Sequence, residues 1–117
     1  MKARAVITYK HYFDVFFMAQ QPKVRDKIIK ILDIIEQVDR IPSNYLKYME
    51  GTNGLFEVRV QFGNNIFRIF CFFDGNRFVI LLTGFQKKTQ KTPPEEIARA
   101  VRLMEEYYEE KRKETEK

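Results

Sequence analysis

Two arginines in neighbouring predicted strands are the residues best suited to chemistry in this sequence. Arg59 lies in FEVRVQF and Arg68 in IFRIFCFF, and Gly63-Asn64 between them is typical of a two-residue hairpin turn. That turn places Arg59 directly opposite Arg68. Like charges so placed destabilise a sheet by a few tenths of a kcal/mol, up to about 1. A phosphate group that bridges the two guanidinium groups would convert this repulsion into binding.

Glu57 offers a different explanation of the same pair. It lies two residues before Arg59 and therefore on the same face of the strand, because side chains alternate along a strand. A diagonal contact from Glu57 to Arg68 would make the arginines part of an ordinary ion pair. Both interpretations remain open at this point.

The next predicted strand, RFVILLTGF, ends in an aromatic residue and a group of lysines. If the Asp74-Gly75 turn has two residues, the odd-numbered residues from 77 to 87 share the face of Arg68. Phe85 then offers a surface on which a base can stack, and Lys87 lies beside it. Lys91, nearer the prolines, fits a solvated loop at least as well.

The available side chains restrict the chemistry. His11 is the only histidine and Cys71 the only cysteine, so the spacing predicts no metal site, no disulfide and no cofactor. Preorganised cations can stabilise a pentacovalent phosphate while a neighbouring 2′-hydroxyl attacks it. This indicates metal-independent RNA cleavage, and plain RNA binding is equally compatible with the spacing.

Two helices, then an antiparallel meander of strands, then one helix must position these residues. We expect a strand at 4–8, helices at 9–20 and 22–39, strands at 55–62, 66–73 and 77–85, and a helix from Thr92-Pro93-Pro94 onward. This order predicts an α+β fold, a mostly antiparallel meander with two N-terminal helices and one C-terminal helix packed on one side. Residues 1–117 form one domain in this prediction, residues 40–54 form a connection, and residues 110–117 are a frayed tail.

Charge and hydropathy restrict the partners. The net charge is +5, and residues 51–92 hold six Lys or Arg against Glu57 and Asp74, which favours an anionic partner such as nucleic acid. No run approaches the roughly 18 apolar residues of a membrane span, and polar residues interrupt the N-terminal stretch. We therefore expect a cytoplasmic protein with no membrane partner and no small-molecule cofactor.

The stretch GLFEVRV…FRIFCFFDGNRFVILLTGFQKKTQKTPPEEIARA resembles the HigB-type toxins of the RelE/HigB-like toxin–antitoxin superfamily, in its phage-derived branch. The shared pattern is Gly-Leu-aromatic-Glu-Leu-Arg, an Arg-Ile/Leu-aromatic strand, hydrophobic-Gly-Phe-x-Lys-Lys, a proline and Glu-Ile-x-x-Ala. The match covers residues 54 to about 100 and extends more weakly over KYME and KVRDKIIKILDIIE.

The resemblance implies the toxin of a type II toxin–antitoxin system. Such a toxin is a RelE-like, metal-independent endoribonuclease that cuts mRNA on the ribosome, leaves a 2′,3′-cyclic phosphate and inhibits translation. Its implied partners are that mRNA and a cognate antitoxin, often with a helix-turn-helix domain. The expected catalytic residues are Arg59, Arg68, Lys87 and Lys88, the expected RNA contacts are Phe85, Lys47, Lys91 and Arg77, and Glu57 is expected to be an arginine partner.

One departure from the pattern leaves an alternative open. Some RelE-like enzymes have a catalytic tyrosine shortly after the basic pair, whereas TQKTPPEEIARA contains no aromatic residue. Tyr107 and Tyr108 lie far along the last helix, where their spacing predicts packing. The alternative is a non-catalytic RNA-binding or antitoxin-binding module, that is, a degenerate toxin.

Overall fold

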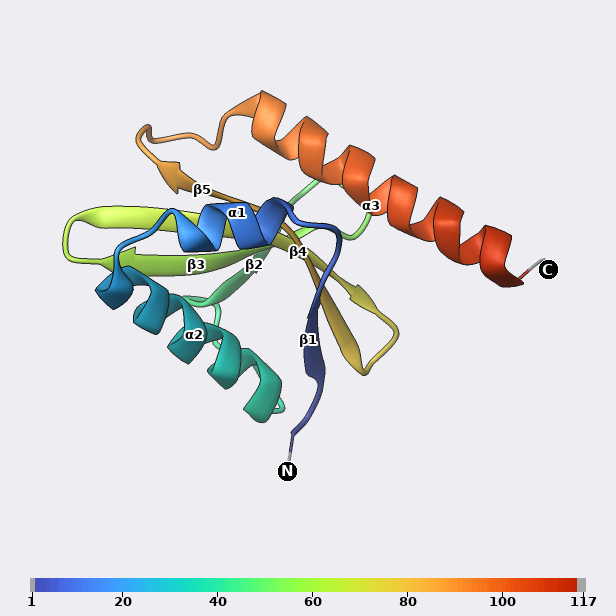
Figure 1. Ribbon diagram of the computed structural model, residues 1–117, viewed down its shortest axis with the longest axis horizontal. Coiled ribbons are helices and arrows are strands. Elements are labelled where there is room, and N and C mark those ends of the chain that lie inside the picture. The colour runs from blue at the N-terminus through green and yellow to red at the C-terminus, as the bar shows by residue number, and fades with distance from the viewer. Residues whose placement is uncertain (1, 116–117) are drawn as a thin grey trace.

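A five-stranded sheet lies at the centre of the computed structural model, which describes residues 2–115 (Figure 1). The elements in chain order are β1 (Ala5–Thr8), α1 (Tyr12–Met18), α2 (Pro22–Gln37), β2 (Leu46–Tyr48), β3 (Phe56–Phe62), β4 (Asn65–Asp74), β5 (Phe78–Lys87) and α3 (Pro94–Thr115). The strand order is β1-β5-β4-β3-β2. The pair β1–β5 is parallel and the other pairs are antiparallel, so the predicted α+β fold class is confirmed.

The helices cover both faces of the sheet, so the expectation that they pack on one side is wrong. Helices α1 and α2 pack on the face that carries Val58, Ile69 and Leu81. Helix α3 packs on the opposite face, against Phe70 and Phe72, and Figure 1 shows α3 and α2 on different sides of the strands. The reason is that every residue of β4 from 67 to 72 is buried, and a strand buried on both faces needs a cover on each.

The predicted register of the β3–β4 hairpin is confirmed. Phe62 pairs with Asn65 and Arg59 pairs with Arg68, as the Gly63-Asn64 turn requires. Gly63 has a φ of 60°, a left-handed conformation that glycine adopts without steric cost.

The β4–β5 hairpin differs from the prediction in two places. Asp74 pairs with Phe78, so residues 75–77 form the turn, and Val79 lies on the α2 face rather than the Arg68 face. A bulge opposite residues 69–71 of β4 then adds one residue to β5. The bulge reverses the alternation, so residues 85 and 87 return to the Arg68 face.

Two further segments depart from the prediction. Leu46–Tyr48 forms strand β2 within the segment predicted to be a connection, and it pairs with β3. Helix α3 continues to Thr115, so the part of the predicted frayed tail that the structure describes is helical. An exposed ion pair joins Lys10 Nζ to Glu106 Oε1 of this helix at 2.6 Å. Residues 116 and 117 of the predicted tail lie outside the described residues.

The helices of residues 2–115 include none that could cross a bilayer, since none is both long and apolar enough.

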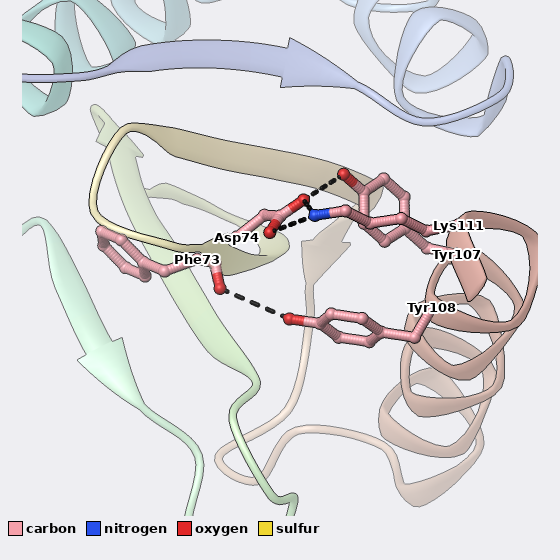
Figure 2. A network of polar contacts seen from close by, with 5 residues as sticks. All are labelled: Phe73, Asp74, Tyr107, Tyr108 and Lys111. Carbon is pink, nitrogen blue, oxygen red and sulfur yellow. Dashed lines mark hydrogen bonds and ion pairs between the residues drawn. The ribbon is translucent and has the colours of Figure 1, made fainter. Parts of the chain in front are cut away.

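Asp74, at the end of β4, ties the second half of α3 to the sheet (Figure 2). Its carboxylate accepts hydrogen bonds from the Tyr107 hydroxyl and from Lys111 Nζ, the latter at 2.7 Å. The Tyr107 ring also packs on Phe72, with ring centroids 5.0 Å apart. The hydrogen bonds from Lys111 and Tyr107 hold the pKa of Asp74 below its ordinary value. Burial, and then the bond to Asp74, raise the pKa of Tyr107 to about 12.

We expect Tyr107→Phe to lower the free energy of unfolding at neutral pH by about 1–2 kcal/mol, because it removes a hydrogen bond to a carboxylate. The pKa of Asp74 is lowered by folding, so its contribution is present above 3.8 and is lost as the pH falls through the folded-state value. Urea unfolding at neutral and acid pH measures this. The difference between wild type and variant should shrink in acid, and a difference that is the same at both pH values would contradict the assignment.

We expect Gly84→Ala to lower the free energy of unfolding by about 1–3 kcal/mol, because a Cβ there would overlap the ring of Phe16 in α1. Urea unfolding of this variant, alone and in a Phe16→Leu background, measures the effect. The penalty should be smaller in the Phe16→Leu background, since the two sites are in contact. Equal penalties in both backgrounds would show that the cost has another origin.

Candidate functional site

Arg59 of β3 and Arg68 of β4 are direct partners across the sheet. The Arg59 N–H donates to the Tyr45 carbonyl at 2.8 Å, so it points away from β4. The arginines therefore form a non-hydrogen-bonded pair, the type in which Cα atoms are about 4.5 Å apart and the side chains are closest. Two positive charges are thus held together by the backbone pairing itself.

Glu57 lies between the two guanidinium groups. Its Oε1 is 3.6 Å from Nε of Arg59 and also 3.6 Å from Nε of Arg68, the second contact being the diagonal one. The Glu57 side chain is only 5% exposed, and its Oε2 has no hydrogen-bond partner. At 3.6 Å these contacts are ion pairs rather than well-formed hydrogen bonds. Two guanidinium groups therefore share one carboxylate, and the three side chains together keep a net positive charge.

The Arg68 side chain is almost fully buried, and its hydrogen-bond donors are only partly satisfied. Its Nη1 donates to the Phe67 carbonyl at 3.1 Å, while its buried Nε has no hydrogen-bond partner. Burial lowers the pKa of Arg68, the charge of Glu57 opposes this shift, and the charge of Arg59 adds to it. Guanidinium remains charged through such shifts, so the group stays a strong donor for an anion.

Phe85 and Lys87 lie on the same face as Arg68. Phe85 pairs with Arg68 across β4–β5, and Lys87 pairs with Ile66. The Phe85 ring packs at 5.6 Å from that of Phe70 in the cluster under α3, so it is half-buried. Only part of Phe85 is therefore available to stack on a base.

The lysines after β5 are divided between a groove and an open loop. Lys87 and Lys88 line a groove of about 590 Å³ together with Asn64 of the β3–β4 turn and Asn65 at the start of β4. Lys91 lies farther along the exposed loop and is not among the residues that line it. The structure thus brings Lys87 and Lys88 beside the hairpin that carries the arginines, and leaves Lys91 in solvent.

Of the predicted RNA contacts Lys47 and Arg77, the structure brings only Lys47 to the face of the arginines. Lys47 is exposed on β2 and pairs with Glu57, which places it on the face of the arginines. Arg77 lies in the β4–β5 turn, next to the Asp74–Phe78 pair. Six residue steps of β4, about 20 Å, separate Arg68 from Asp74. The structure therefore does not bring Arg77 to the site, because the turn faces the other end of the sheet.

Lys27 and Tyr45 lie near the arginines although the sequence did not single them out as site residues. Both line a groove of about 430 Å³ together with Arg59, Gln61 and Arg68. The sequence carries no site signal at either position, because Lys27 is typical of a solvent-facing helix residue and Tyr45 lies in a turn-rich segment. A prediction of β2 would have revealed Tyr45, since β2 begins at the next residue.

Other potential reactive groups lie apart from the arginines. The His11 side chain is 91% exposed at the start of α1, where it faces Asp14. Cys71 is fully buried, and burial raises the pKa of its thiol. Within residues 2–115, no cluster of three or more His, Cys, Asp or Glu side chains is suited to hold a metal ion.

Comparisons with known proteins agree with this fold. The family described as "Phage derived protein Gp49-like (DUF891)" matches residues 15–105. A chain in the crystal structure of the archaeal RelE-RelB complex from Pyrococcus horikoshii OT3 superposes with a TM-score of 0.54 at 16% identity. The alignment covers 77% of this chain and 99% of that one, and at this identity it shows the fold alone. The search of curated proteins gave no match.

We expect Glu57→Gln to lower the free energy of unfolding by about 3 kcal/mol, because it leaves Arg68 buried beside Arg59 without a counter-charge. Phosphate added to the buffer should restore part of this loss, and more in the variant than in the wild type, since an anion can replace the carboxylate. Urea unfolding with and without phosphate measures both effects. Glu105→Gln, on the exposed side of α3, is the control. A Glu57→Gln protein as stable as wild type would refute the shared-carboxylate arrangement.

Proposed function

The chain belongs to the family of phage-derived Gp49-like proteins and has the fold of the RelE-RelB neighbour, and from these findings we propose that it is the toxin of a type II toxin–antitoxin system. The finer assignment to the HigB type, with residues 1–117 as one toxin domain, rests on the Gly-Leu-aromatic-Glu-Leu-Arg and Gly-Phe-x-Lys-Lys patterns. The neighbour is a complex, which supports an antitoxin as the protein partner here. A helix-turn-helix antitoxin is part of the same proposal.

The proposed activity is ribosome-dependent endoribonuclease cleavage of mRNA without a metal ion. The observation that carries it is the pair Arg59 and Arg68, held against each other by β-pairing with a single carboxylate between them. The Arg59 side chain is 34% exposed and both arginines line a groove, so a phosphate group that enters the groove can meet guanidinium donors. An anion with two or three free oxygens stabilises such a site most, because it can accept hydrogen bonds from both guanidinium groups.

The proposed reaction is an internal transesterification. The 2′-oxygen of one nucleotide attacks the adjacent phosphorus, the bond from phosphorus to the 5′-oxygen breaks, and a 2′,3′-cyclic phosphate and a free 5′-hydroxyl result. A base accepts the 2′-hydroxyl proton, and the 5′-oxygen gains one. Arg59 and Arg68 hold the non-bridging oxygens, where negative charge increases in the transition state. Lys87 and Lys88 lie beside the β3–β4 turn and support the leaving group by charge.

A second function has one observation in its favour. Glu57 is occupied by two ion pairs, and Tyr107 is hydrogen-bonded to Asp74 at the other end of β4. These groups are therefore not free to remove the 2′-hydroxyl proton. A degenerate toxin that binds RNA or its antitoxin without cutting would have such an arrangement. Product ends distinguish the two functions.

Primer extension on an mRNA in a purified translation system tests the proposal. We expect new 5′ ends within translated codons, formed equally by enzyme treated with EDTA. Arg59→Ala and Arg68→Ala should each reduce cleavage by about 100-fold or more, because each removes a preorganised cation from the transition state. Arg102→Ala, on the exposed side of α3, should cut like the wild type.

Circular dichroism and thermal unfolding must show that each variant is folded, since Arg68 is buried. No cleavage by the folded wild-type protein would favour the binding module. Full activity of a folded Arg68→Ala protein would remove the arginine pair from the mechanism.

A further inference from the structure

The groove that contains Arg59 and Arg68 extends around the uncovered edge of β3 to helix α2. Its volume is about 430 Å³, and four parts of the chain contribute to it: α2, the segment before β2, β3 and β4. The lining side chains that matter here are Lys27, Tyr45, Arg59, Gln61 and Arg68. The groove is therefore separate from the one that Lys87 and Lys88 line, and it meets the arginines from the other side.

Part of the β3 edge is uncovered because β2 is short. Strand β2 pairs with β3 only from Phe56 to Val58. The N–H of the next residue, Arg59, is taken by the Tyr45 carbonyl at 2.8 Å. Backbone N–H groups two residues apart point to the same edge of a strand, so the N–H of Gln61 points into the groove beyond the start of β2. An uncovered edge of this kind presents backbone donors to a ligand.

The charged side chains that line the groove are all positive. Lys27 is half-buried on α2, Arg59 is partly exposed, and Arg68 is almost fully buried, with its Nε 3.6 Å from Glu57 Oε1. None of the residues that line the groove is acidic. Glu57, between the two guanidinium groups, has only 5% of its side chain exposed and does not line the groove. Three cations and a backbone N–H thus surround a space large enough for a phosphate group.

We propose that this groove binds a backbone phosphate of single-stranded RNA, the neighbour of the phosphate held by Arg59 and Arg68. Lys27 and the Gln61 N–H are its ligands. Lys27 is then a substrate-binding residue on a helix that the site motifs do not include. The RNA backbone crosses the free edge of β3 between the sheet and α2. This inference rests on the proposed function, because it takes RNA as the substrate.

A titration of the ¹⁵N-labelled protein with a short single-stranded 2′-O-methyl RNA tests it, since that RNA lacks the attacking hydroxyl and cannot be cut. We expect the Gln61 amide signal to shift in proportion to occupancy. Lys27→Ala should weaken binding about tenfold. It should also reduce the slope of log affinity against log salt by about 0.7, the value for one phosphate contact on a single strand. Lys30→Ala, exposed on the same helix and absent from the groove, is the matched control and should bind like the wild type.

The outcomes separate this inference from the proposed function. If Arg59→Ala weakens binding but Lys27→Ala and Lys30→Ala both bind like wild type, the groove is not the phosphate site and the proposed function stands. If Lys27→Ala weakens binding and the arginine variants still cleave mRNA fully, the groove stands and the catalytic assignment falls. A folded wild-type protein that shows no shifts with the RNA overturns the groove proposal. The amide spectrum of each variant confirms its fold, and Lys27→Gln provides a second test with less loss of packing.

Discussion

Burial of β4 on both faces is the constraint on which the rest of the structure depends. Phe67, Ile69 and Cys71 face α1 and α2, while Phe70 and Phe72 face α3. Because both faces are apolar, the N-terminal helices and the C-terminal helix cannot share one side. The same burial removes Arg68 from water, and a desolvated guanidinium requires a counter-charge. Glu57 supplies it from the adjacent strand, and the pairing of β3 with β4 brings Arg59 to the same carboxylate.

A shortage of negative charge follows from this arrangement. In a low-dielectric site an electrostatic interaction is much stronger than in bulk water, for repulsion and attraction alike. Two guanidinium groups that share one carboxylate therefore repel each other without a ligand. A bound phosphate group would offset that repulsion. The groove between β3 and α2 includes both arginines among its lining residues and gives such a group a direction of approach. The strand register places the cations, and the covering helices determine how far they are desolvated.

The strand pattern alone was enough to predict the β3–β4 register and the Arg59–Arg68 pair, because the Gly63-Asn64 turn and two-residue alternation are local signals. The position of Phe85 was predicted for the wrong reason. The turn after Asp74 is longer than expected, and a bulge later in β5 offsets the error. Bulges, the short strand β2 and the groove beside Lys27 depend on contacts between distant segments, which a single sequence does not display. For Arg77 the sequence indicated a charge but not which end of the sheet that charge occupies.

The parallel pairing of β1 with β5 has a consequence for how the chain folds. The hairpins β3–β4 and β4–β5 join neighbours in sequence, so they can form from local contacts. Ala5 pairs with Phe78 and Thr8 with Leu81, so β1 has no partner strand until β5 has been synthesised. Pairings between residues so far apart close large loops and slow folding. During translation the N-terminal strand must therefore wait, with Val6 of β1 and Phe13 of α1 still exposed to solvent, until most of the chain has left the ribosome.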